Sequence, residues 1–162
     1  MSEQEDANAI IARDNLLGEI ASQVVSAKKS QNWIPCFLGL GLLVKQTLRQ
    51  SAEIVFVDEK SRITRDDENE AIMKLVHDER IDMQEASKIM TVCVVSDFVN
   101  NEDLYAPLVL ESNTLQLPFN EQGTDSIERR TIIDLRESDT WAEMVPQYVS
   151  VILPICRKLI CE

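Results

Sequence analysis

Histidine and cysteine, which carry much of the nucleophilic and metal chemistry in proteins, are sparse in this chain. His77 is the only histidine, so a metal site made of several histidines is excluded within one chain. Glu70 and His77 are seven residues apart and would share one helix face, where they could hold a divalent ion, and Cys93 could pair with His77 as nucleophile and base. Neither pattern is specific to these chemistries. We expect His77 to face solvent at a helix end, and we expect no catalytic site, no resident metal and no cofactor.

The acidic run from Asp66 to Glu70 has enough carboxylates for a calcium loop but lacks the rest of the motif. A calcium loop needs a central glycine and a closing glutamate at its twelfth position, and this run has neither. Its acids instead follow Thr64, a good helix-capping residue, and the helix dipole favours acids in a first turn. The run therefore predicts the start of a helix that ends near His77.

Acidic residues outnumber basic ones by 28 to 16, and the excess is uneven along the chain. Residues 1–52 hold five acids and five bases, whereas residues 53–103 hold fourteen acids and six bases. A net charge of −12 repels nucleic acid and anionic membranes, which are bound through lysine and arginine. Acids concentrated in one block produce a directional field, which favours a partner protein with a basic surface.

A second helix is expected from Asp82 to about Phe98, because Asp82 and Glu85 are spaced as a capping pair. The two helices would form a hairpin with a densely acidic outer face. We predict that this face is the partner-binding surface. It comprises Asp66, Asp67, Glu68, Glu70, Asp78, Glu79, Asp82 and Glu85.

Part of this hairpin has a short sequence similarity to a DNA-binding motif. The pair Glu85-Ala86 and the apolar spacing between Ile81 and Val92 are similar to the first helix and turn of excisionase-type helix-turn-helix domains. The segment that follows, residues 93–101, lacks the Arg-, Lys- or Ser-rich face that would read DNA. We therefore expect no DNA-binding role.

Residues Asp6 to Lys29 have apolar residues at helical spacings and predict one long helix. Ile10, Leu17 and Val24 recur every seven residues along it, in a narrow stripe typical of packing against one neighbouring helix. The neighbour could belong to the same chain or to a second copy. We therefore treat this stripe as a candidate homodimer face.

Two uncharged stretches, residues 33–44 and 144–156, are shorter than the roughly 18–20 residues of a membrane-spanning helix. A helix from Pro35 to about Arg49 is predicted to contain the first stretch, and because it is apolar on nearly every side we expect it in the core. The alternative for both stretches is a partner-binding surface. Pro146 and Pro154 predict that the second stretch is a kinked helix or two short pieces.

After Asn101, β-branched residues lie between turn signals, which is typical of strands. Strands are predicted there at residues 108–111, 114–117 and 130–135, the first two joined as a hairpin, and one further strand is predicted earlier, at residues 53–57. A closing helix is predicted from Thr140. The sequence thus predicts an α+β fold in a single domain, residues 1–162, with mostly helical residues 1–103 followed by a small antiparallel sheet and a C-terminal helix in residues 104–162.

The cysteines are isolated from one another and most lie in apolar runs, which predicts reduced thiols in a cytoplasmic protein. They are Cys36, Cys93, Cys156 and Cys161. The polar, acidic first residues do not resemble a signal or transit peptide. This localisation agrees with a protein that acts on another soluble protein.

These observations favour a non-enzymatic, acidic protein-binding module. Its mode of action would be that of an inhibitor or immunity protein, or of a phage anti-defence protein, which covers a basic surface of its partner. A dimeric assembly or secretion chaperone, or a structural subunit, is the first alternative, and a carboxylate enzyme with a divalent metal is the second. The sequence does not identify the partner or the oligomeric state.

Overall fold

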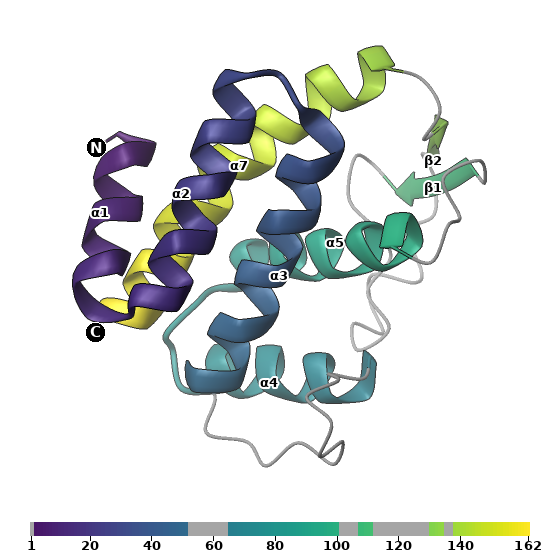
Figure 1. Ribbon diagram of the computed structural model, residues 1–162. Coiled ribbons are helices and arrows are strands. Elements are labelled where there is room, and N and C mark those ends of the chain that lie inside the picture. The colour runs from purple at the N-terminus through teal and green to yellow at the C-terminus, as the bar shows by residue number, and fades with distance from the viewer. Residues whose placement is uncertain (1, 52–64, 101–106, 112–129, 135–137) are drawn as a thin grey trace.

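The computed structural model of the protein describes residues 2–51, 65–100, 107–111, 130–134 and 138–162. Helices account for most of these residues, and Figure 1 shows them packed side by side. In chain order the described elements are α1 (Glu3–Arg13), α2 (Asn15–Lys29), α3 (Trp33–Ser51), α4 (Arg65–His77), α5 (Met83–Asn100), β1 (Pro107–Glu111), β2 (Arg130–Asp134) and α7 (Ser138–Cys161).

The prediction of an α+β fold is wrong, because helices alone build the core that the structure describes. The two short strands form one antiparallel ribbon, in which Val109 pairs with Ile132, and this ribbon lies at the edge of the helices (Figure 1). The predicted hairpin joined residues 108–111 to 114–117, whereas β1 pairs with β2. Two five-residue strands do not form a layer that could cover a hydrophobic core. The predicted strand at residues 53–57 and the hairpin arm at 114–117 lie outside the described residues.

The single helix predicted over residues 6–29 is instead two helices, which meet at Asp14. This residue has an extended backbone (φ −147°, ψ 110°), and its Oδ1 accepts the Leu17 N–H at 3.0 Å as the N-cap of α2. Its own N–H donates to the Ile10 carbonyl and ends α1. The Gln50 amide also donates to Asp14, and this bond is the main reason that the pKa of Asp14 is lowered. Asp14 thus folds the chain back into a helical hairpin.

Gly18 permits the close approach of α1 and α2. A Cβ atom at this position would lie 2.1 Å from Cγ1 and 2.3 Å from Cα of Ile11. The backbone of α1 occupies the space that a side chain would need, so only glycine fits here without moving a helix. Gly41 has a similar role where α3 crosses α5, because a Cβ there would lie 2.6 Å from Cβ of Ser96.

The predicted dimer face is part of the protein's own core. Ile10, Leu17 and Val24 are all buried, because α1 and α2 pack against each other and against α3 and α7. A seven-residue stripe indicates that a helix has a neighbour, but does not distinguish a neighbour in the same chain from one in a second copy. The stripe is therefore unavailable as a surface in this fold.

The core is organised around α3 and α7, which pack against each other. Phe37 of α3 is fully buried and makes edge-to-face contacts with Trp141 and Tyr148 of α7, with ring centroids 5.9 and 6.0 Å apart. The second uncharged stretch is one continuous helix despite its prolines. Pro146 and Pro154 are eight residues apart on the outer side of α7, where carbonyl groups that lose a helical N–H partner can reach water.

The other predicted helices agree with the structure. Residues 35–49 lie within α3, and residues 82–98 correspond to α5. The predicted helix ending at His77 is α4, whereas its predicted cap, Thr64, lies outside the described residues. The helix α5 continues without a break through Cys93, so the turn that a helix-turn-helix motif would need is absent there.

We expect that Gly18→Ala destabilises the protein by about 2 kcal/mol, because the added methyl group overlaps the backbone of α1. Gly39→Ala is the matched control: its Cβ would meet one side-chain atom, Cγ2 of Val24 at 3.0 Å, and no backbone atom, and alanine is the better helix former. Urea unfolding followed by circular dichroism measures both variants. Equal stability of the two would contradict the close packing of α1 on α2.

Candidate functional site

Four of the eight acids predicted to bind a partner are exposed around the connection between α4 and α5. Glu70 lies on the outer face of α4, Asp78 and Glu79 follow the end of that helix, and Asp82 immediately precedes α5. We call these four residues the acidic corner. The outer face of α4 also carries exposed Lys74, whose Nζ lies 3.8 Å from Oδ2 of Asp78, so the corner retains an excess of negative charge.

The remaining predicted acids do not form part of an exposed surface. Glu68 is fully buried and Asp67 is nearly so, which corrects their predicted role. Glu85 is partly buried and bonded to two other residues. Asp66 lies in the first turn of α4, and its side chain is outside the described part of the structure.

The helical repeat of α4 explains which acids are inside and which are outside. Its buried positions after Glu68 are Ala71, Ile72 and Leu75, which share one face with Glu68 at spacings of three and four residues. Glu70 falls on the opposite face. One turn of helix thus separates a buried carboxylate from an exposed one in the same acidic run.

The chain leaves α4 through a left-handed residue, Glu79, with φ of 60°. The Arg80 N–H donates to the Leu75 carbonyl at 2.9 Å, and the Glu79 N–H donates to the Val76 carbonyl at 3.0 Å. This pair of bonds is a Schellman motif with Glu79 at the position that glycine usually occupies. The end of α2 has the same motif, with Gln31 at φ of 57°. The sequence indicates a break in the helical pattern at both places, but without a glycine it does not indicate the left-handed conformation.

Arg80 fastens this connection to the C-terminal ends of two other helices. Its Nη1 donates to the carbonyl of Ser51, the last residue of α3, at 2.7 Å, and its Nη2 donates to the carbonyl of Leu159 in the last turn of α7 at 3.0 Å. The last carbonyl groups of a helix have no N–H donor within the same helix, and the Arg80 guanidinium supplies donors to two of them. Nothing in the sequence around Arg80 indicated this role, because both partners are distant along the chain.

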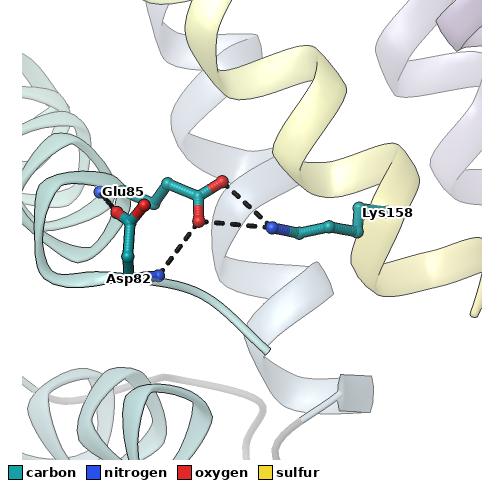
Figure 2. A network of polar contacts seen from close by, with 3 residues as sticks. All are labelled: Asp82, Glu85 and Lys158. Atoms are coloured by element: carbon teal, nitrogen blue, oxygen red, sulfur yellow. Dashed lines mark hydrogen bonds and ion pairs between the residues drawn. The ribbon is translucent and has the colours of Figure 1, made fainter. Parts of the chain in front are cut away.

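The predicted capping pair at the start of α5 is confirmed, and it also reaches α7 (Figure 2). Oε1 of Glu85 accepts the Asp82 N–H at 3.0 Å, and Oδ1 of Asp82 accepts the Glu85 N–H at 2.7 Å. Lys158 of α7 donates to both carboxylate oxygens of Glu85, at 3.0 and 3.2 Å. Asp82 and Glu85 therefore have structural roles, and Glu85 is largely committed to them.

A partly buried ion-pair cluster joins α3, α4 and α5. Nζ of Lys45 lies 2.8 Å from Oε1 of Glu68 and 2.6 Å from Oδ1 of Asp97. Burial alone would lower the pKa of Lys45, but the hydrogen bonds that Lys45 donates to Asp97 and Glu68 outweigh this effect and raise the pKa. Because Glu68 is fully buried, the cluster fixes which face of α4 turns inward.

The geometry does not support the nucleophile pair or the metal site considered from the sequence. His77 is 88% exposed, as predicted, whereas Cys93 is fully buried in the core. Among the residues that the structure describes, no group of three or more His, Cys, Asp or Glu side chains could hold a metal ion.

None of the four cysteines forms a disulfide bond in the described part of the chain. Burial raises the pKa of Cys36 to about 11 and that of Cys156 to about 12. Cys36 also donates to the Val24 carbonyl, with Sγ 3.4 Å from the oxygen. These thiols act as small apolar residues of the core.

The apolar part of α7 is longer than the uncharged stretch suggested. Within the described residues, one helical segment, Trp141–Cys161, is long and apolar enough to cross a membrane. Half of its most apolar part is buried inside the bundle, against α1, α3 and α5.

Comparisons of the chain with models of known protein families, with curated proteins and with solved structures find no match. Any statement about its function therefore rests on the residues themselves.

Lys45→Met is expected to destabilise the fold by about 3 kcal/mol, because it removes the ammonium group that lies 2.8 Å from the buried carboxylate of Glu68. The double variant Lys45→Met/Glu68→Met removes both charges and should recover most of this loss. Chemical unfolding of the two variants and the wild type provides the measurement. A double variant that is no more stable than the single one would show that the ion pair does not hold α4.

Stability should fall as the pH rises above about 9, because the thiols of Cys36 and Cys156 then ionise in the unfolded chain but remain protonated in the folded one. Their folded pKa values are raised, so the stability they contribute is complete below the unfolded pKa and is lost as the pH approaches 11 to 12. Each thiol contributes a slope of about −1.4 kcal/mol per pH unit over this window. Urea unfolding in reductant at several pH values should show a shallower slope for Cys156→Ala. Leu40→Ala, a core truncation without a titrating group, should lower stability and leave the slope unchanged.

Proposed function

We propose that the protein is a non-enzymatic binding module that docks its acidic corner on a basic surface of a protein partner. In this role it would act as an inhibitor or as an immunity or anti-defence protein. The proposal is supported by Asp78 and Glu79, two exposed acids of the corner that lie where helix formation does not favour a negative charge. Three observations bear on it: the backbone at Glu79, the position of Asp78 and Glu79 at a helix end, and the apolar side chains beside the acidic corner.

The backbone conformation of Glu79 is the observation that carries the proposal. A residue other than glycine in the left-handed region costs roughly 1–2 kcal/mol, and Glu79 gains no ion pair in the described structure that would offset this cost. Such strain is common where a side chain is needed for function. An exposed carboxylate therefore occupies a position at which glycine would be more stable.

The helix dipole also disfavours negative charge at Asp78 and Glu79. Both follow the C-terminal end of α4, where the partial negative charge of the carbonyl groups repels carboxylates. Acids at the start of a helix, such as Asp82, stabilise it, but acids at the end of one do not. Asp78 and Glu79 are thus the part of the acidic excess that helix formation does not explain.

Exposed methionines accompany the acidic corner and would complete a docking surface. Met73 on α4 is 36% exposed and Met83, the first residue of α5, is 41% exposed. Methionine adapts to the shape of a partner and supplies apolar contact. The acids would speed association with a basic partner, and the methionines would lengthen the lifetime of the complex.

The test compares two glycine substitutions at equivalent turns. Glu79→Gly and Gln31→Gly should each stabilise the fold by about 1 kcal/mol, because both relieve a left-handed backbone. Glu79→Gly alone should weaken binding to a basic partner recovered with the wild-type chain and then purified. Loss of binding in a more stable variant separates docking from folding, and equal binding by both variants would contradict the proposal.

Salt dependence and charge reversal complete this test, with association rates measured by biolayer interferometry at low and high salt. Reversing Glu70, Asp78 and Glu79 to Lys should slow association at least tenfold at low salt. The control reverses three exposed acids away from the corner and has the same net charge; they are Glu5, Glu19 and Glu143. Association that is independent of salt, or equally slow in both triple variants, would rule out docking through the acidic corner.

A further inference from the structure

Two cations, Arg80 and Lys158, attach the acidic corner to the rest of the fold, each through its own hydrogen bonds. Arg80 lies within the corner, between Glu79 and Asp82 in sequence, yet its guanidinium is bonded to the Ser51 and Leu159 carbonyls rather than to the neighbouring acids. Lys158 of α7 holds the far side of the corner through Glu85 (Figure 2).

Several bonds converge on the short segment from Asp78 to Asp82. The Arg80 and Ile81 N–H groups both reach the Leu75 carbonyl, at 2.9 and 3.4 Å, and the side chain of Ile81 is buried in the core. The hydroxyl of Ser51 also donates to the Leu159 carbonyl, at 3.3 Å, so Arg80 joins helix ends that already touch. With both ends of the segment fastened, the acids between them have little freedom to move.

The shape of the arginine side chain suits this position. A guanidinium is planar and presents several N–H donors in a fixed fork, so Nη1 and Nη2 can reach two carbonyls at once. A lysine at this position would keep the charge but would offer a single ammonium group. Both carbonyls carry the partial negative charge of a helix C-terminus, which favours a cation beside them.

We infer that Arg80 is a positioning residue for the docking function proposed above: by capping α3 and α7 it holds Asp78, Glu79 and Asp82 in a preformed docking geometry. The inference concerns how the acidic corner is arranged before a partner arrives. Preformed groups bind more tightly because no ordering is needed on contact.

The sign of its effect on binding separates this role from a simple effect of charge. Removing Arg80 makes the acidic corner more negative, so an electrostatic effect alone would strengthen binding to a basic partner. Loss of a positioning residue would weaken binding despite the added negative charge. The two explanations thus predict opposite outcomes for the same variant.

The first measurement uses the free protein and needs no partner. In Arg80→Gln, hydrogen exchange followed by mass spectrometry should show the amides of residues 78–86 exchanging at least tenfold faster, with the α1–α2 hairpin unchanged. Arg13→Gln, at an exposed arginine on α1, is the control with the same change of charge. Unchanged exchange in residues 78–86, or equal acceleration throughout the chain, would overturn the inference.

The second measurement uses the purified basic partner of the previous section. Arg80→Gln should bind at least tenfold more weakly, Arg80→Lys should be intermediate, and Arg13→Gln should bind like the wild type. Binding by Arg80→Gln that is equal to or tighter than that of the wild type would overturn the inference. If the wild type binds no basic partner while residues 78–86 of Arg80→Gln exchange faster, the proposed function fails and the role of Arg80 in holding this segment stands.

Discussion

The arrangement of the outer helices depends on one partly buried cation, Lys45. Its ammonium group pairs with Glu68 of α4 and Asp97 of α5, so a single side chain of α3 sets the orientation of both helices. Buried ion pairs add little net stability, because removing charges from water costs about as much as their attraction returns. They do exclude alternative packings, since a rotated α4 would bury a carboxylate without a cation. The exposure of Glu70 on the opposite face of α4 is a direct result.

Local signals in the sequence were sufficient for the helices but not for the class of fold. The capping pair of Asp82 and Glu85 was predicted because both partners lie within four residues of each other. The same local reasoning made residues 108–111 and 130–135 look like parts of a sheet, and β-branched composition cannot show whether further strands exist to extend it. The break at Asp14 had two signals, Asp14 as a cap and Gly18 four residues later, but each also occurs inside an uninterrupted helix.

The division of the acidic residues into buried and exposed ones could not be predicted from the sequence. Glu68 and Glu70 are two residues apart in one charged run. The helical repeat places them on different faces of α4, but Lys45, the cation that pairs with the buried Glu68, lies on another helix and is distant in the sequence. The left-handed turn at Glu79 was missed for a different reason, since the usual signal for such a turn is glycine. Glu79, one of the two described residues that depart from this rule, belongs to the surface that the proposed docking uses, whereas Gln31 does not.

The contact between α7 and the beginning of the chain has a consequence for biosynthesis. Arg157 donates to the buried carboxylate of Asp6 at 3.1 Å, and the Leu159 carbonyl receives the guanidinium of Arg80. In a ribosome-bound chain whose residues 157–161 have not yet emerged, Asp6 of α1 lacks its hydrogen bond from Arg157. The connection between α4 and α5 likewise lacks the hydrogen bond from Arg80 to the Leu159 carbonyl. The attachment of α1 and of the connection between α4 and α5 to α7 is therefore a late event, which waits until the last turn of α7 has emerged.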